Sequence, residues 1–318
     1  MNILIYIPTS LNSPEFEILL TKAQNFINQG KKVTILTCAG GKDYACSINI
    51  YSNPLICSVC NNYKKNSFSK IRGDFELIQT DKNLINKEFN FRNLDQLKRF
   101  KLKGIDIGLA SYSSYLDNTK DVYIEGKIAK KTMKKIISTT INLSEFFLRL
   151  IKKKHIDSAY IFNGRQNQYR PLVRHLLKNK IKTICLEYKG PGDTNVFEFR
   201  NHLPHDYNYF AYRIERYFKR QKLTNSEITR KVSHYYRSII KSKQIQYYDG
   251  KSIIFNKNQK LGLLPKDFNK MEENIVVIIS SEFEYVALGG VYDFKIYKTQ
   301  TEAIRRIAQS LLKSKNKI

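Results

Sequence analysis

Four cysteines gather in one short stretch of this 318-residue chain. Cys38, Cys46, Cys57 and Cys60 follow the spacing C-x7-C-x10-C-x2-C. Thiolates this close in sequence can share a metal ion, form disulfides or carry out redox chemistry. We expect a structural zinc site with all four thiolates as ligands, although a typical zinc ribbon has two C-x-x-C pairs and this stretch has one.

Other uses of the four cysteines stay open. Thiolates also suit an iron–sulfur cluster, and reduced cysteines need no ligand at all. A thioredoxin-like redox site is not expected, because Cys57 and Cys60 do not directly follow a first strand and precede a clear helix.

A second group of candidate residues follows the ends of two predicted strands. The strand predicted over 157–164 leads into Arg165 and Arg170, whose guanidinium groups can bind a phosphate or carboxylate. The strand predicted over 181–188 carries Glu187 near its end, where a carboxylate could deprotonate a hydroxyl nucleophile. A surface ion pair is the competing interpretation of the loop arginines.

The segment RNHLPHD places two imidazoles around a proline turn. His202 and His205 could each act as a base or contact a phosphate, and a structural role for each stays open. The proline between them argues against a shared metal ion on one helical face.

A further strand, predicted over 274–281, ends in SSEFEY. We expect its polar residues, Ser280, Ser281 and Glu282, to bind substrate. Open α/β sheets bind ligands at the carboxyl ends of their strands, so the polar residues that follow the strands near 164, 187 and 281 are expected to line one crevice.

The elements that would position these residues alternate between strand and helix. The run NILIYI (2–7) predicts a strand buried on both faces, a helix follows and is capped by Gly30, and KKVTILTC (31–38) predicts the second strand. No glycine-rich phosphate loop follows the first strand. Helical patterns cover about 92–103, 124–154, 170–180, 208–248 and 299–315. This order predicts an α/β fold with a parallel sheet and helices on both faces.

The charge balance is strongly basic, with 55 Lys and Arg against 28 Asp and Glu, a net charge of +27. It fits a polyanion partner, either nucleic acid or an anionic membrane surface, and it also fits compositional drift, because lysines are scattered through the chain. The lysine-rich pattern over 124–154 favours a solvated face above a core stripe rather than a membrane-surface helix.

No targeting segment or membrane span is predicted. The opening MNILIYIP is too short for a signal peptide, and no stretch approaches the roughly 18 apolar residues that a span needs. We therefore expect a cytoplasmic protein, and a reducing compartment argues against structural disulfides.

Five segments together carry a family resemblance. They are TC…C…N…C-x-x-C at 37–60, DIGLASYSS at 106–114, YIFNGR at 160–165, RNHLPHD at 200–206 and IISSEFEYVALG at 278–289. In this order, the segments resemble a bacterial family of capsule and lipopolysaccharide biosynthesis proteins, which is glycosyltransferase-like with the two-domain GT-B architecture.

The resemblance implies a Rossmann-like, acceptor-side domain over 1–265, with the cysteine-rich loop 38–60. It also implies the start of a nucleotide-sugar-binding α/β domain over 266–318, which this chain leaves incomplete. GT-B enzymes take the donor between their two domains, so the enzyme assignment is expected for a full-length chain.

The implied function is sugar transfer from a nucleotide sugar to a glycan or lipid-linked acceptor, at the cytoplasmic face of the membrane. Glu187, His202 or His205 would be the base and Arg165 would bind an anionic group, while the cysteines would clasp their loop. The alternatives are a basic, zinc-stabilised nucleic-acid-binding protein and a non-catalytic partner in polysaccharide assembly. Because no RNA- or DNA-recognition motif is present, nucleic acid is not expected as a partner.

Overall fold

The computed structural model describes residues 1–41, 44–82, 84–87, 89–188, 196–221, 223–240, 245–246, 252–253, 288–289, 297 and 300–313. The strands are β1 (Asn2–Ile7), β2 (Lys32–Thr37), β3 (Glu76–Gln79), β4 (Ser158–Phe162), β5 (Lys182–Tyr188), β6 (Val196–Arg200), β7 (Ile245–Gln246) and β8 (Ser252–Ile253). The helices are α1 (Glu15–Asn28), α2 (Pro54–Phe68), α3 (Leu94–Arg99), α4 (Ile107–Thr119), α5 (Gly126–Lys153), α6 (Arg170–Lys178), α7 (Tyr207–Gln221), α8 (Asn225–Ile240) and α10 (Gln300–Lys313).

The main sheet has six strands in the order β3-β2-β1-β4-β5-β6. The first five run parallel, and β6 pairs antiparallel to β5, with Tyr188 opposite Val196. This is a Rossmann-like α/β fold, and the strand order reverses between β1 and β4. The predicted parallel sheet is confirmed for five strands, whereas the antiparallel edge strand β6 was not predicted.

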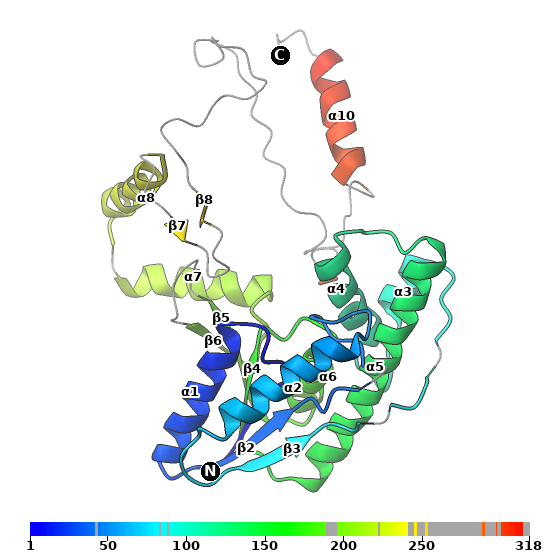
Figure 1. Cartoon of the computed structure of the whole chain (residues 1–318). Helices are drawn as coiled ribbons and strands as arrows, with labels where there is room; N and C mark the ends of the chain where they lie inside the picture. Colours follow the sequence, from blue (N-terminus) through cyan, green and yellow to red (C-terminus); the bar gives the residue numbers. More distant parts are fainter. Residues whose placement is uncertain are drawn as a thin grey trace.

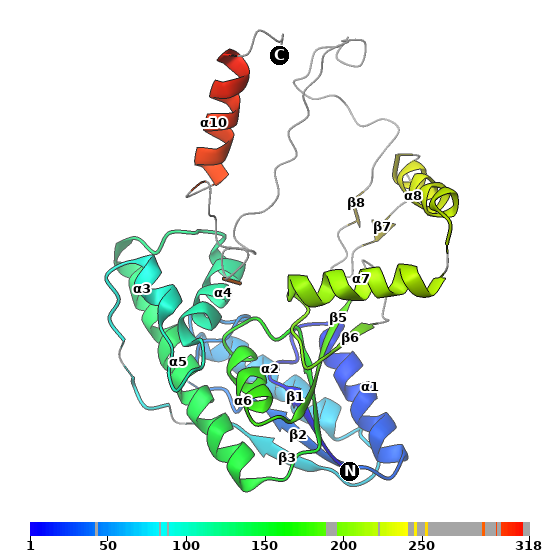
Figure 2. The same ribbon diagram turned by 180° about the vertical axis from the view of Figure 1, so that it is seen from behind.

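Alternation along β1 explains the two-sided core. Leu4 and Tyr6 pack with residues of α5 and α6 on one face. Ile3, Ile5 and Ile7 pack with α1 and with Phe68 of α2 on the other. Figure 1 shows α1 and α2 in front of the sheet. Figure 2, the view from the opposite side, shows α5 and α6 in front of it. Because β1 is buried on both faces, nearly all of its residues are apolar, which explains the continuous apolar run in the sequence.

Helix α5 joins the sheet to a smaller helical core. Its amino-terminal half packs Met133 and Ile136 against Tyr112 and Leu116 of α4. The apolar stripe of α5 is buried, so the prediction of a solvated lysine face above a core stripe is confirmed. No helix in the described part of the chain is long and apolar enough to cross a membrane.

The cysteine-rich stretch contains a helix that the sequence analysis missed. Asn53 caps α2, its side chain accepting a hydrogen bond from Leu55 N at 3.0 Å, and Pro54 occupies the first turn. These are typical helix-start residues. Cys57 and Cys60 therefore lie inside a helix, and strand β3 and helix α4 were likewise not predicted.

The later predictions have mixed outcomes. Helices α7 and α8 confirm the helical pattern predicted over 208–248 as far as Ile240, but Ile245–Gln246 forms strand β7 instead; α10 confirms the pattern over 299–315. The predicted strand 274–281 lies outside the described residues, as do Ser280, Ser281 and Glu282. The proposed division at residue 266 stays a prediction.

Candidate functional site at the carboxyl edge of the sheet

The loop after β4 begins at the point where the strand order reverses. Asn163 has a φ of 56° and Gly164 a φ of 93°, both in the left-handed region. A Cβ on Gly164 would lie 2.7 Å from Leu203 Cδ2, so a larger residue would collide as well as strain the backbone. The Asn-Gly pair thus turns the chain sharply and leaves the Asn163 side chain at the sheet edge.

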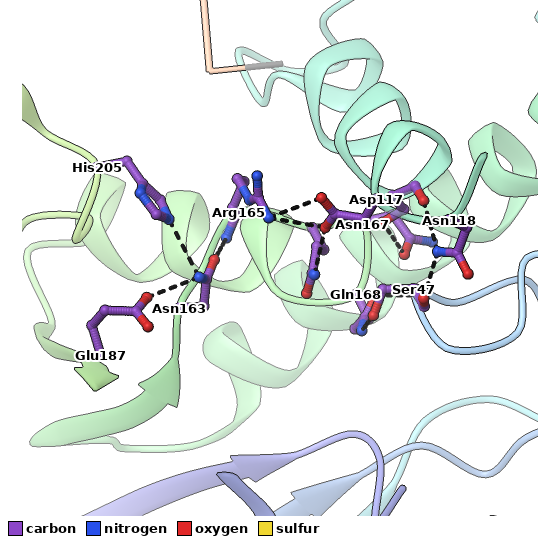
Figure 3. Close-up of polar contacts among 11 residues, drawn as sticks. Ser47, Asp117, Asn118, Asn163, Arg165, Asn167, Gln168, Glu187 and His205 are labelled. Atoms are coloured by element: carbon purple, nitrogen blue, oxygen red, sulfur yellow. Dashed lines mark hydrogen bonds and ion pairs between the residues drawn. The ribbon is translucent and has the colours of Figure 1, made fainter. Parts of the chain in front are cut away.

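Asn163 connects two of the predicted catalytic residues, as Figure 3 shows. Its Nδ2 donates to Glu187 Oε2 at 2.9 Å and lies 3.3 Å from His205 Nε2. Its Oδ1 accepts the backbone N–H of Arg165 at 3.1 Å. The structure therefore brings Glu187 and His205, two alternative candidates for the base, to the same asparagine, for which the sequence alone indicates no role.

The electrostatics distinguish Glu187 from His205 as a base. Burial raises the pKa of Glu187, and the hydrogen bonds from Tyr188 N and Asn163 only partly oppose this. Burial, followed by the positive charges of Arg165 and Arg170, lowers the pKa of His205 to about 4. A carboxylate with a raised pKa is a better match to neutral pH than a weakly basic imidazole, so Glu187 is the stronger candidate base.

Glu15, in the first turn of α1, belongs to the same electrostatic group. Burial and then the neighbouring Glu187 carboxylate raise the pKa of Glu15 to about 8. Two carboxyl groups that influence each other in a partly buried site hold a proton near neutral pH. Sequence reasoning missed Glu15, because an acidic residue in a first helical turn is an ordinary helix-start signal.

Arg165 lies at the edge of the site but is engaged by a carboxylate of the protein. Its Nη2 lies 2.9 and 3.0 Å from the two carboxylate oxygens of Asp117 in α4. Gln166 Nε2 donates to the same carboxylate at 2.7 Å. The Arg165 and Asp117 side chains are 11% and 16% exposed, so this is a largely buried ion pair rather than a surface one. Anion binding by Arg165 stays a prediction.

A chain of buried polar contacts continues from this ion pair towards the cysteine-rich stretch, also drawn in Figure 3. Asn167 accepts a hydrogen bond from Ser114 Oγ at 2.9 Å and donates to the carbonyl of Ala45 at 2.7 Å. Gln168 accepts the backbone N–H of Ser47 at 3.1 Å, and Asn118 donates to the Ser47 carbonyl at 2.6 Å. These contacts fix the 163–168 loop against α4 and against residues 45–47.

Arg170 begins α6 and is 3% exposed. Its Nε lies 2.7 Å from Asp106 Oδ2, and Arg174 contacts both Asp106 oxygens at 3.0 and 3.1 Å. Burial lowers the pKa of Arg170 to about 10, which still leaves it charged at neutral pH. Two guanidinium groups therefore share one carboxylate.

A pocket of about 250 Å³ opens beside this pair, lined among others by Arg170, Arg174, His202 and His205. His202 Nδ1 lies 2.8 Å from Asp206 Oδ2, and its ring stacks on Tyr209 with centroids 3.8 Å apart. His202 thus lines this pocket in contact with Asp206, whereas His205 lines the same pocket in contact with Asn163.

Three of the four clustered cysteines accept hydrogen bonds from different residues. Gly40 N donates to Cys38 at 3.1 Å, Asn49 to Cys57 at 3.4 Å and Ser10 N to Cys60 at 3.4 Å. Among the described residues, no group of three or more His, Cys, Asp or Glu is placed to hold a metal ion. The four-thiolate site is therefore not assembled in this structure, and zinc binding stays a prediction for metal analysis.

The thiols also differ in acidity. Burial of Cys60 acts to raise its pKa, but the hydrogen bonds from Ser10 and the charge of Lys64 outweigh burial and lower the pKa. Burial and the proximity of Cys38 raise the pKa of Cys46 to about 12, and burial raises that of Cys185 to about 12. All five cysteines are free.

Comparison with known proteins adds little. No family model matches the chain, and no curated protein matches it. Among solved structures, the chain is similar to the crystal structure of tyrosyl-tRNA synthetase complexed with L-tyrosine from Archaeoglobus fulgidus, at 11% identity and a TM-score of 0.28. The match covers 56% of this chain and 50% of that one, about half its length, and it carries no inference about function.

Proposed function

We propose that this protein is a GT-B-type glycosyltransferase of capsule or lipopolysaccharide biosynthesis, with the described sheet as its acceptor side. The observation that carries the proposal is the position of Glu187. Its carboxyl group, with a raised pKa, lies at the carboxyl edge of a Rossmann-like sheet and is held by Asn163. Ligands of such sheets bind at this edge.

In the proposed reaction, the acceptor hydroxyl donates its proton to the Glu187 carboxylate. The hydroxyl oxygen forms a bond to the anomeric carbon of the donor sugar, and the nucleotide leaves with the electrons of the broken glycosidic bond. Asn163 holds the carboxylate in place, and neutral His205 leaves the site without a competing positive charge. General-base assistance of this kind contributes about 10²- to 10⁴-fold to the rate.

The test is sugar transfer from radiolabelled nucleotide sugars to lipid extracts and glycan acceptors, comparing the parent with Glu187→Gln. The matched control is Glu198→Gln on the neighbouring strand β6, because Glu198 instead pairs with Lys22 at 3.0 Å. We expect Glu187→Gln to lose at least about 100-fold of the rate and Glu198→Gln to keep it. Equal rates for Glu187→Gln and the parent would remove Glu187 from the mechanism.

We also propose that the reaction takes place at an anionic membrane surface, contacted by α7. In support, Tyr207, Phe210, Ile214, Tyr217 and Phe218 recur at helical spacing and are 39–60% exposed. The same helix carries four basic residues, Arg213, Arg216, Lys219 and Arg220, against the single acid Glu215. Interfacial aromatics and basic residues together suit a membrane bearing negative lipids.

The membrane proposal is tested by co-sedimentation with vesicles of phosphatidylglycerol and phosphatidylcholine. A variant with Tyr217→Ser and Phe218→Ser should bind anionic vesicles more weakly than the parent, while Phe89→Ser, in a partly buried position away from α7, serves as a folding control. Equal vesicle binding by the parent and by the variant with Tyr217→Ser and Phe218→Ser would overturn the proposal. Binding of the parent to RNA but not to vesicles would overturn it in favour of another partner.

A further inference from the structure

The pocket beside α6 is a second site, distinct from the Glu187 carboxyl group but next to it. Its volume of about 250 Å³ falls below the roughly 300–1,000 Å³ of pockets that bury a drug-sized ligand. It therefore fits one compact group of a substrate rather than a whole nucleotide sugar. The pocket is closed on one side by Leu288, whose carbonyl lies 3.4 Å from Arg170 Nη2.

The charges around the pocket favour an anion. Arg170 and Arg174 share the single carboxylate of Asp106, which leaves an excess of positive charge in this pair. Asp106 is held ionised, because the two arginines lower its pKa against the effect of burial. Asp206, the acid among the described residues that line the pocket, contacts His202 at 2.8 Å.

Two residues of the pocket lining, Arg174 and His202, each have a ring or guanidinium nitrogen without a hydrogen bond in the described part of the chain. Arg174 uses Nε and Nη2 to hold Asp106, and within the described residues no hydrogen bond involves its Nη1. His202 uses Nδ1 to contact Asp206, and in the same part of the chain its Nε2 makes no hydrogen bond. Asp106 fixes the guanidinium plane, and the Tyr209 ring fixes the imidazole, so both groups are preorganised.

His205 relates the pocket to the candidate base. It lines the pocket, and its Nε2 lies 3.3 Å from Asn163 Nδ2, the group that donates to Glu187. A ligand group in the pocket would therefore be separated from the base by two side chains. That separation suits a charged substituent of the same substrate whose hydroxyl or sugar reacts at Glu187.

We propose that this pocket binds a phosphate group of a substrate through Arg174 and His202. The phosphate belongs either to the diphosphate of the nucleotide-sugar donor or to the lipid phosphate of the acceptor. The identity of the substrate rests on the proposed function, whereas the binding of phosphate does not. The Arg174 guanidinium is a directional donor to phosphate oxygens, and His202, whose Nδ1–H already donates to Asp206, donates from Nε2 when its ring is protonated.

The test is isothermal titration calorimetry of the full chain with inorganic pyrophosphate, uridine diphosphate and farnesyl phosphate. The parent should bind at least one of the three, and Arg174→Ala and His202→Ala should each weaken that binding about 10- to 100-fold. The matched control is Lys178→Ala, which removes a positive charge from the same helix but outside the pocket lining. Thermal melting of each variant confirms that it is folded.

Each outcome decides the proposal. Tighter binding of uridine diphosphate supports the donor as the source of the phosphate, and tighter binding of farnesyl phosphate supports the acceptor. The proposal of phosphate binding in this pocket is overturned if the parent binds none of the probes. It is also overturned if Lys178→Ala weakens binding as much as Arg174→Ala and His202→Ala do. Sugar transfer without phosphate binding would refute the pocket alone, while phosphate binding without transfer would refute the proposed function alone.

Discussion

Two regions of this molecule contain clustered reactive residues, and they differ in how the clustering arises. The cysteines of residues 38–60 are close in sequence, yet Cys38, Cys57 and Cys60 accept hydrogen bonds from three different residues. Asn163, Glu187 and His205 come from three separate segments, after β4, in β5 and after β6, yet they meet at one sheet edge. The parallel pairing of β4 with β5 brings Asn163 and Glu187 together, because the carboxyl ends of neighbouring parallel strands lie side by side, and the segment after the antiparallel strand β6 adds His205.

The comparison is open to direct tests of stability. Asp117→Ala should have the largest effect, because it leaves the largely buried Arg165 charge without its carboxylate. We expect a loss of about 3 kcal/mol in the free energy of unfolding, measured by guanidinium denaturation. Cys57→Ser, which keeps a hydrogen-bond acceptor for Asn49, should cost less than about 1 kcal/mol. A reversed order would mean that the cysteine-rich stretch is the better-connected region.

The Glu15–Glu187 pair predicts a pH dependence of stability. Because the folded pKa of Glu15 is raised to about 8 from an ordinary value of 4.5, the folded state binds a proton that the unfolded state releases. Stability is therefore lost as pH rises from about 4.5 through about 8. Glu15→Gln should remove this loss, on the order of a few kcal/mol at pH 9, measured by denaturation at several pH values. If variant and parent show the same dependence of stability on pH, Glu15 does not hold a proton in the folded state and is not part of the site.

The role of Asn163 predicts a smaller effect on activity. Asn163→Gly keeps a residue that tolerates the left-handed φ of 56°, but it removes the hydrogen bond to Glu187. We expect about a 10-fold loss of transfer rate, which corresponds to about 1.4 kcal/mol, in the nucleotide-sugar assay. If Asn163 positions Glu187, the pH at which activity is half-maximal should also rise, because a hydrogen bond that lowers the pKa of Glu187 is lost. A rate loss with an unchanged pH profile would indicate a purely structural role.

Cys60 should matter least. Cys60→Ser should change stability and transfer by less than about 0.5 kcal/mol, because the hydroxyl can still accept from Ser10. In the parent, mass spectrometry should show iodoacetamide modifying Cys60 before Cys185, whose pKa is about 12. If zinc binds all four clustered thiols, these thiols should react with iodoacetamide only after a chelator has removed the zinc. Metal analysis of the untreated protein should then give about one zinc per chain. A large loss of transfer in Cys60→Ser would assign chemistry to the cysteine-rich stretch after all.

The sequence predicts the buried strands and long helices of this fold because their hydrophobic patterns are complete. Strand β1 and helix α5 follow directly from such patterns. Strand β3 is only four residues long, with three of them exposed, and so has no such pattern. Strand β6 depends on its pairing with β5, which a linear reading does not reveal.

The candidate site follows the same rule. Glu187 and His205 could be predicted because each adjoins a recognisable strand end or turn. Asp117 could not, because it lies within a helix, and only the packing of α4 brings it to Arg165. Glu15 was also missed, since its altered acidity depends on burial and on a carboxylate 172 positions further along the chain.

The length of α5 has a consequence for how the protein unfolds. One part of this helix, with Met133 and Ile136, belongs to the helical core, and another, with Phe147 and Leu150, belongs to the core beneath the sheet. A continuous 28-residue helix cannot melt in one part without weakening its hydrogen-bonded continuation. The two cores should therefore unfold as a single cooperative unit, with the backbone amides in the middle of α5 among the slowest to exchange with solvent.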